Sequence, residues 1–382
     1  MNITNNKNKL YYSKVKLITR VMELTVLQED FQKAVSLALR YVSQRPAVPI
    51  LSHILHEAKN GQLEISATNL EVGINLRIGA SVKSEGKTTV QAKTLYETLS
   101  SLPKSRIDIS EKEDSLNLVC GDYTVNLPVM PPNDFPGIFI EIIKPMTILK
   151  STLKNIAQYV SFAAASPDAR PEYSGILFLK RGSQIDVVAT DGIRLSKKVI
   201  EGNLGAEKIL IPAHIISDIP KVFLTDEVRV QFDSERGQII FANDNITLIS
   251  RVLGADFPDF EKIIPKNWET RITVPKEEFL SAVQIASVFA QDYKIELLVS
   301  RESISLISEN PQLGSQKSSI PSKVEGEEIT IAFNARYIRE FLNVLEGEEV
   351  VIDLTNPGSP GVFHDPKDER FIHLIMPIRS QV

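Results

Sequence analysis

Three short motifs in the sequence contain residue types that could do chemistry. Gly86-Lys87-Thr88 resembles the end of a phosphate-binding loop, in which backbone amides and a lysine hold nucleotide phosphates. The spacing does not fit, because Ser81 stands where that loop needs its first glycine. Strand-like residues also flank the motif, where a strand and a helix are required. We therefore expect no nucleotide-binding loop here.

His53 and His56, followed by Glu57, weakly resemble the spacing of metal ligands. Residues 49–58 alternate in apolar character, which predicts a strand. Residues three apart on a strand point to opposite faces, so a structural role is expected for both histidines. The remaining histidines are not clustered at ligand spacing: His214, His364 and His373. We expect no metal and no cofactor.

Asp191-Gly192 predicts a hairpin turn, because glycine tolerates positive φ, and this interpretation is preferred to a catalytic role for Asp191. No Gly-x-Ser-x-Gly motif occurs, and the acidic residues are scattered. An enzyme is therefore not expected. Two alternatives stay open: a carbohydrate or nucleotide enzyme whose site the sequence does not reveal, and a structural β-rich oligomer that binds no DNA.

The composition is that of an ordinary globular protein. The chain has 382 residues, with 43 basic and 48 acidic side chains and a formal net charge of −5, a length for which two to three domains are expected. The single cysteine, Cys120, excludes a disulfide framework and a cysteine-rich metal site. No apolar run approaches the roughly 18 residues that span a bilayer. A cytoplasmic protein without membrane contact is expected.

Residues 1–21 differ from the rest of the chain, because they contain five basic residues and no acidic one. The remainder then has 43 − 5 = 38 basic and 48 acidic residues, or −10. We interpret 1–21 as a disordered tail or an upstream start, with the folded part beginning at Met22. A transit peptide is the alternative.

An amphipathic helix pattern recurs three times. Its apolar residues follow the i, i+3, i+4, i+7 spacing, and the second and third sets lie 122 and 248 residues beyond the first. The sets are Phe31, Ala34, Val35 and Ala38; Leu153, Ile156, Ala157 and Val160; and Phe279, Ala282, Val283 and Ala286. A pattern that returns after 122 residues and again after 248 − 122 = 126 residues predicts tandem copies of one fold.

Other landmarks obey the same interval. Ala67-Thr68-Asn69 returns as Ala189-Thr190-Asp191, and Phe135-Pro136 returns as Phe257-Pro258, both 122 residues later. A second helix is predicted in each copy, at 92–102, 212–223 and 334–345, with strands between the helices. We predict an α+β fold of three tandem domains, 22–145, 146–267 and 268–382, each with two helices and about six to eight strands.

The repeat limits the architecture. Two helices for so many strands should both lie on one face of the sheets. Tandem copies related by a fixed rotation generate an arc, here a half-ring with two unpaired sheet edges. Such an arc is expected to close head to tail with a second copy of the chain.

Several longer strings carry a resemblance to a known family. They are QRPAVPIL (44–51), RPEYSGILF (170–178), ATDGIRLS (189–196), FPDFEKIIPKN (257–267) and FIHLIMPIR (371–379). With the threefold repeat, the sequence resembles the bacterial DNA polymerase III beta subunit family over 22–382. The resemblance implies a sliding clamp: a ring of two subunits that encircles duplex DNA and confers processivity on a nucleotidyltransferase, the polymerase, without a catalytic site of its own.

The resemblance also implies partners. They are duplex DNA, a second copy of the chain, the catalytic subunit of the replicative polymerase, a clamp-loader complex that supplies the ATP chemistry, and other clients that carry a short clamp-binding peptide. Binding to DNA should be independent of sequence, because phosphate contacts carry no sequence information.

Basic residues on or after the predicted helices are the candidate DNA contacts. They are Lys33, Arg40, Arg45, Lys93, Lys150, Lys154, Arg170, Lys221, Arg336 and Arg339. Such residues also occur on the solvated helix faces of any globular protein, so the resemblance is what favours DNA. It implies that Arg45 is the strongest candidate and that Pro167, Asp168 and Arg170 lie on the matching loop of the second domain.

The family resemblance implies a hydrophobic client-peptide pocket between domains two and three. Its residues are Tyr173, Gly175, Thr190, Gly192, Arg194, Leu195, Pro258, Ile263, Leu374, Met376, Pro377, Ile378 and Arg379. Leu195, Ile263, Leu374 and Met376 would form apolar walls, with Arg194 and Arg379 at the rim. From the residues alone, a core seam between two domains is the alternative.

At the expected dimer contact, the resemblance implies that Tyr123 and Val125 meet Val288 and Phe289 of the other subunit. The sequence departs from the family near the pocket. Ile193 stands where histidine is common, Ser174 stands where asparagine is common, and residues 380–382 extend the end of the chain. These departures concern the fine specificity of the pocket.

Overall fold

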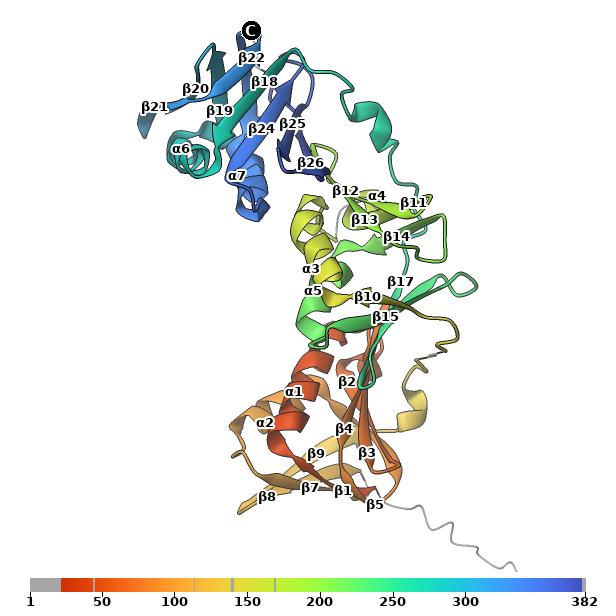
Figure 1. Cartoon of the computed structure of the whole chain (residues 1–382). Helices are drawn as coiled ribbons and strands as arrows, with labels where there is room; N and C mark the ends of the chain where they lie inside the picture. Colours follow the sequence, from red (N-terminus) through yellow and green to blue (C-terminus); the bar gives the residue numbers. More distant parts are fainter. Residues whose placement is uncertain (1–21, 44, 113, 139–140, 168–169, 380–382) are drawn as a thin grey trace, which may run out of the picture. The chain divides into compact units, whose positions relative to one another are not determined.

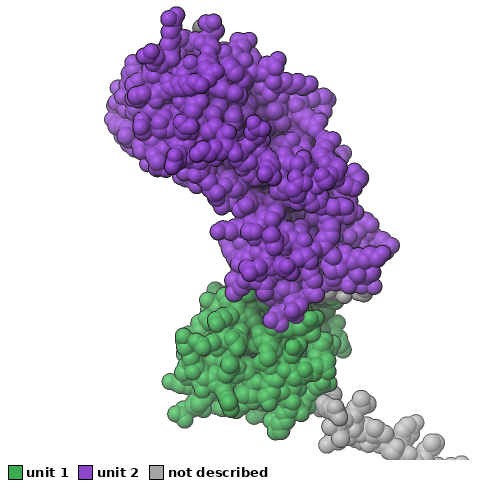
Figure 2. Space-filling view, viewed as in Figure 1, with its two compact units in different colours: residues 1–70, 74–138 green, residues 71–73, 139–382 purple. Residues whose placement is uncertain are grey.

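A computed structural model of the chain describes residues 22–43, 45–112, 114–138, 141–167 and 170–379. The predictions for the tail 1–21, for Asp168 and for residues 380–382 therefore lie outside the described residues. The chain divides into two compact units, coloured separately in Figure 2. The first comprises residues up to Leu70 and Ile74–Ile138, and the second comprises Glu71–Gly73 and the chain beyond Ile138.

The first unit contains the first repeat (Figure 1). Its helices are α1 (Gln28–Ala38) and α2 (Ala92–Ser101). Its strands are β1 (Glu23–Leu27), β2 (His53–Lys59), β3 (Gln62–Thr68), β4 (Val72–Gly79), β5 (Ser81–Ser84), β6 (Gly86–Gln91), β7 (Arg106–Lys112), β8 (Ser115–Cys120) and β9 (Tyr123–Met130). They are arranged in the order β4-β3-β2-β6-β9-β8-β7-β1-β5.

The second unit contains the second and third repeats. The second repeat has helices α3 (Lys150–Tyr159), α4 (Pro171–Ser174) and α5 (Ala213–Val222). Its strands are β10 (Met146–Leu149), β11 (Gly175–Arg181), β12 (Gln184–Thr190), β13 (Arg194–Glu201), β14 (Lys208–Pro212), β15 (Glu227–Asp233), β16 (Gln238–Ala242) and β17 (Ile246–Arg251).

The third repeat has helices α6 (Lys276–Phe289) and α7 (Ala335–Val344). Its strands are β18 (Thr270–Pro275), β19 (Lys294–Ser300), β20 (Ser303–Asn310), β21 (Gly314–Pro321), β22 (Lys323–Gly326), β23 (Ile329–Asn334), β24 (Glu349–Leu354), β25 (Gly361–Asp365) and β26 (Asp368–Ile375). None of the described helices in either unit combines the length and apolar character needed to cross a lipid bilayer.

The two helices of each repeat pack together, α1 on α2, α3 on α5 and α6 on α7. The predicted apolar positions of α1 and α6 are the buried ones, including Phe31 and Phe279, which are both fully buried. A stripe of this kind covers the adjoining sheet and leaves the opposite helix face to solvent. The threefold α+β fold predicted from the sequence is confirmed.

One sheet joins the second and third repeats. Its strands follow the order β14-β11-β12-β13-β26-β25-β24-β18-β22. Strand β13 of the second repeat pairs antiparallel with β26 of the third, and five successive residue pairs lie opposite each other, from Arg194 and Ile375 to Lys198 and Phe371. The second and third repeats therefore share one compact unit.

The Phe-Pro corners have a packing role. Phe135 is 8% exposed and packs with Ile50 and Leu51. Phe257 is 7% exposed and belongs to a core cluster with Leu195 and Leu374. Each corner thus folds the end of a repeat back onto the core, which explains why the pair recurs at a fixed interval.

Three details differ from the sequence prediction. Residues 49–58 are not one strand, because a short 3-10 helix (Pro49–Ser52) precedes β2, and proline at its start presets a helical φ. The described parts of the first and third repeats have nine strands each. The predicted number of six to eight strands per repeat is too low because β5 and β22 have four residues each, with little apolar character. The single-turn helix α4 was also not predicted; it begins at Pro171.

Candidate functional site

The turn between β12 and β13 is built by its own side chains. Gly192 has a φ of +90°, which glycine adopts without strain. The Asp191 Oδ1 atom accepts hydrogen bonds from the backbone N–H groups of Ile193 and Arg194, each at 3.0 Å. Thr190 Oγ1 accepts from the Gly192 N–H at 3.0 Å and donates to the Arg194 carbonyl at 2.5 Å. These bonds satisfy the backbone and confirm the hairpin turn predicted at Asp191-Gly192.

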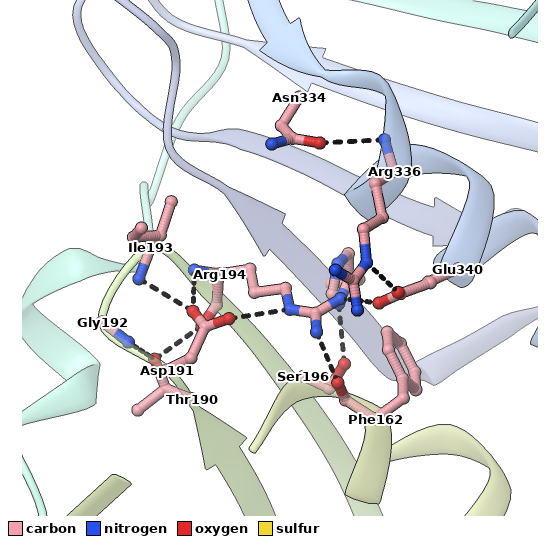
Figure 3. Close-up of polar contacts among 11 residues, drawn as sticks. Phe162, Thr190, Asp191, Gly192, Ile193, Arg194, Ser196, Asn334, Arg336 and Glu340 are labelled. Carbon is pink, nitrogen blue, oxygen red and sulfur yellow. Dashed lines mark hydrogen bonds and ion pairs between the residues drawn. The ribbon is translucent and has the colours of Figure 1, made fainter. Parts of the chain in front are cut away.

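Arg194 extends from this turn into the junction between the second and third repeats, and it is only 7% exposed. Its Nε lies 3.0 Å from Asp191 Oδ2, one terminal nitrogen donates to the Phe162 carbonyl at 2.6 Å, and the other pairs with Glu340 on α7. Figure 3 shows the side chain reaching from the turn toward Glu340.

Aromatic rings complete the surroundings of Arg194. Its guanidinium carbon lies 4.4 Å from the ring centroid of Tyr337 and 5.5 Å from that of Phe162. A guanidinium is attracted to such ring faces, more strongly when water is excluded. The rim position expected for Arg194 is therefore wrong: its charge is used inside the junction.

The carboxyl of Glu340 is shared between two arginines. It pairs with Arg194 and, through Oε1, accepts from Arg336 Nε at 2.8 Å (Figure 3). Burial alone would raise the pKa of Glu340, but the hydrogen bonds from Arg336 and Arg194 hold it below its usual range. Glu340 is therefore ionised at neutral pH.

Leu195 and Leu374 are core residues. They are 1% and 2% exposed, and they lie opposite each other in the β13–β26 pair. Their cluster also contains Val188, Leu210 and Phe260. Both side chains thus form the seam between two repeats, which was the alternative to a pocket wall.

Ile263 and Met376 are the predicted pocket residues that expose much apolar surface, 45% and 38% respectively. They line a surface hollow of about 420 Å³, together with Ile264, Pro265 and Pro360. Lys262 and Lys266 also line it. The hollow is therefore lined by apolar side chains and by two lysines.

The last described residues cross from one repeat to the other. The Met376 N–H donates to the Ile193 carbonyl at 2.9 Å, and the Ile378 N–H donates to the Ala332 carbonyl at 2.8 Å. Ile378 and Arg379 line a second hollow of about 470 Å³ with Ala332 and Pro357. Pro377, between the two anchors, is half-buried.

Of the other predicted pocket residues, Tyr173 lies beside the turn. A Cβ on Gly192 would lie 3.6 Å from the Tyr173 ring, so the two residues are neighbours. Gly175 is buried, and a Cβ there would come within 2.7 Å of Leu210. Thr190 is buried and Pro258 half-buried. The predicted pocket residues are thus divided between the core of the junction and two separate surface hollows.

The candidate DNA contacts lie on or directly after helices in all three repeats. Lys33 is on α1, Lys93 on α2, Lys150 and Lys154 on α3, Lys221 on α5, and Arg336 and Arg339 on α7. Arg40 is in the 3-10 helix after α1, while Arg45 and Arg170 are exposed in the connections after α1 and α3. Lys150 and Arg339 are half-buried, and the others are exposed.

Four of these cations make ion pairs within their own segments, and the cation is exposed in each pair. Lys93 lies 3.9 Å from Glu97, Lys221 lies 3.7 Å from Asp218, and Arg170 lies 4.0 Å from Glu172. The fourth is Arg336 with Glu340. Ion pairs exposed to water contribute about 1 kcal/mol or less, so a phosphate can compete for these cations.

The predicted dimer residues are accessible. Tyr123 on β9 is 60% exposed and Val288 on α6 is 63% exposed. Val125 and Phe289 are half-buried. Ile285 on α6 and Leu313 before β21, which were not predicted, are further exposed apolar residues of the third repeat.

The motifs considered first for chemistry have structural roles. Gly86 begins β6, and a Cβ there would lie 2.8 Å from Met22. His56 packs its ring edge to face with Phe31 at 5.6 Å, and burial lowers its pKa to about 4. No group of three or more metal-ligating side chains occurs among the described residues.

Glu340, Tyr337 and Phe162 were not found from the sequence. Phe162 and Glu340 are 32 and 146 residues from Arg194, so no local spacing relates them. The one available signal was Asn334, whose side chain accepts from the Arg336 N–H at 2.9 Å and caps α7. Such a cap predicts a helix start but no partner in another repeat.

Comparison with known families gives matches along nearly the whole described chain. The models for the DNA polymerase III beta subunit match three times: the N-terminal domain at residues 22–139, the central domain at 147–259 and the C-terminal domain at 261–379. The curated relatives include the beta sliding clamp of Bacillus subtilis, 26% identical over 377 residues, with 94% of this chain and 100% of the relative covered.

Solved structures are similar over the same length. The DNA polymerase sliding clamp of Bacillus subtilis has a TM-score of 0.89 at 25% identity, covering 94% of this chain and 100% of that one. The C. crescentus beta sliding clamp has a TM-score of 0.90 at 26% identity, covering 95% and 100%. The latter is described with PEG bound to a proposed beta-motif tethering region.

Proposed function

Because this chain belongs to the DNA polymerase III beta subunit family, we propose that two copies of it close head to tail into a ring around duplex DNA. It is a sliding clamp, a processivity factor and not a catalytic polymerase subunit. We attribute no transferase activity to the chain itself. The observation that carries the proposal is the threefold repeat, in which every copy presents basic side chains on its helices.

The DNA face of the proposed ring consists of these helices. The net charge of −10 beyond residue 21 opposes simple capture of DNA, so the cations must be sorted toward the hole and most acids away from it. Arg45 and Arg170 occupy matching connections after the first helix of their repeats, and we propose both as phosphate contacts. A closed ring is retained by topology, so weak contacts suffice and permit sliding.

Client proteins are proposed to bind at the surface around Met376 and Ile263. A short linear peptide could place an apolar side chain in the adjoining hollow of about 420 Å³. The flexible thioether of methionine adapts to different apolar partners. The tethering region named for the C. crescentus clamp supports a peptide-binding surface in this family.

The internal repeat suggests how the dimer is made. Strands β4, β13 and β21 are equivalent to one another in the first, second and third repeats. The last strands of the three repeats, β9, β17 and β26, are likewise equivalent. Since β13 pairs with β26, its equivalent β21 should pair with β9 of another subunit. Strand β21 is an edge strand of its four-stranded sheet. Only two residue pairs link β9 to β6, so most of that edge of β9 is also available for the contact.

Three domains, 22–145, 146–267 and 268–382, then form each half of the ring. The proposed partners are duplex DNA, the catalytic subunit of the replicative polymerase, a separate ATP-driven loader and other peptide-bearing clients. A clamp raises polymerase processivity by tethering, which acts as a high local concentration. A protein with these partners works in the cytoplasm, on replicating DNA.

Two measurements test the proposal together. Light scattering should give twice the chain mass of 42.6 kDa. After loading by the cognate loader and ATP onto nicked circular DNA, the protein should stay on the circle at high salt and leave once the circle is cut. A monomer, or equal salt-resistant retention on circular and linear DNA, would reject the ring.

A further inference from the structure

Glu340 is the only described acidic side chain that contacts both Arg194 and Arg336. These two arginines have different surroundings. Arg194 has 6% of its side chain exposed, whereas Arg336 has 56% exposed. One carboxylate thus joins a buried cation at the pocket turn to an accessible cation on α7 (Figure 3).

The buried end of this chain of contacts leads to the client surface. Arg194 and its neighbours fix the turn at Asp191, and the Ile193 carbonyl in that turn accepts the Met376 N–H at 2.9 Å. The turn and Met376 are therefore directly connected by one backbone hydrogen bond.

The exposed end leads to the proposed DNA face. Arg336 lies in the first turn of α7, where the Asn334 side chain accepts a hydrogen bond from its backbone N–H. A phosphate that binds the Arg336 guanidinium competes with Glu340 for the same donors. Charge-assisted hydrogen bonds to phosphate are strong and directional, so a phosphate can replace Glu340 at the exposed Arg336 side chain.

We propose that Glu340 is a positioning residue that couples DNA contact at Arg336 to the shape of the client pocket through Arg194. When phosphate takes Arg336, the whole Glu340 charge is directed to Arg194, which holds the Asp191 turn and Met376 in one arrangement. Pre-ordering a binding surface strengthens its affinity, so DNA should favour client binding. By linkage, a bound client favours the DNA contact equally. This inference rests on the proposed function.

The experiment observes Met376 directly. In protein labelled with ¹³C at its methionine methyl groups, of which the chain has five, a short DNA duplex is titrated at low salt. We expect the Met376 methyl signal to shift with DNA occupancy in the wild type. In Glu340→Gln, we expect the duplex to bind within about twofold of wild type while the Met376 shift is lost.

Two further variants separate positioning from loss of structure. Glu328→Gln removes an exposed carboxylate of the same repeat and should keep the shift. Arg336→Gln leaves the buried Arg194 with all its partners and should lose the shift at saturating DNA. Fluorescence of Trp268, the single tryptophan, verifies that the unit containing these residues stays folded.

The outcomes are distinguishable. An unchanged Met376 shift in Glu340→Gln, or DNA binding to the wild type without any shift, would overturn the coupling and leave the clamp function standing. A wild type that does not bind the duplex at low salt would overturn the DNA contact at Arg336 and this inference with it, whereas loss of retention on nicked circular DNA after loading would reject the proposed function.

Discussion

Ser196 and His373 face each other across the β13–β26 pair and share a hydrogen bond of 2.6 Å between Ser196 Oγ and His373 Nδ1. Both residues are fully buried. The His373 ring also stacks on Phe341 of α7 at 5.4 Å. The seam between two repeats therefore contains a specific polar contact as well as apolar packing.

Ser196→Ala should destabilise the second unit. The substitution leaves His373 Nδ1 buried without a partner, which costs about 1–3 kcal/mol. Urea unfolding followed by Trp268 fluorescence measures the loss, because Trp268 lies in this unit. Ser234→Ala, in the exposed turn between β15 and β16 of the same unit, is the matched control and should leave the midpoint unchanged. Equal midpoints for both variants would contradict this role for Ser196.

The first unit should lose stability as the pH falls from 6.5 toward 4. Burial lowers the pKa of His56 to about 4 in the folded chain, whereas an unfolded histidine titrates near 6.5. Between these values the unfolded state binds more protons, so acid favours unfolding by up to about 3 kcal/mol. His56→Leu should remove this part of the pH dependence.

Cys120 provides the measurement, because it is the only cysteine and is buried in the first unit. Its labelling by a dipyridyl disulfide in urea reports unfolding of that unit at pH 5 and pH 7. The same drop in stability in wild type and His56→Leu would show that His56 does not cause it.

Met376→Ala and Leu195→Ala should have different effects, because Met376 belongs to the proposed client pocket and Leu195 to the core. Met376 is partly exposed, so its truncation should weaken binding of the purified replicative polymerase and change stability by only about 0.5 kcal/mol. Leu195 is buried, and its truncation should cost about 2–5 kcal/mol of stability. Calorimetric binding and urea unfolding test both; undiminished polymerase affinity in Met376→Ala would remove Met376 from the pocket.

Charge reversal at Arg45 and Arg170 should weaken DNA binding without affecting the dimer. Each lost phosphate contact should reduce the slope of log affinity against log salt by about one. Fluorescence anisotropy of a labelled duplex at several salt concentrations measures this slope, and light scattering checks the dimer. An unaltered slope in the double variant would count against both contacts.

Phe289→Asp should release monomers, because it places a charge in an apolar contact. Light scattering over a concentration series should show the mass fall by half. Leu224→Asp is the control, since Leu224 is 81% exposed and lies outside the proposed interface. A dimer that survives Phe289→Asp would exclude Phe289 from the interface.

The fold could be predicted from the sequence because the same helix and strand pattern occurs in each repeat. The apolar stripe at Phe31 reappears at Phe279, and both stripes are buried as expected. Short strands such as β5 escaped detection, since four half-exposed residues carry little periodic signal.

The site was less predictable, because its geometry depends on contacts between distant residues. Leu195 was assigned to a pocket wall, yet it lies in a strand whose sheet continues into the next repeat, so it is covered. Arg194 was assigned to a rim, but Phe162 and Glu340 surround its charge. Only tertiary structure brings these partners to one place.

The shared sheet of the second and third repeats has a mechanical consequence. Sliding β13 past β26 by one residue would turn every side chain of the strand to the wrong face, so the junction resists shear. These two repeats should therefore move as one rigid lever. In the proposed ring, opening would therefore have to occur somewhere other than the β13–β26 pair.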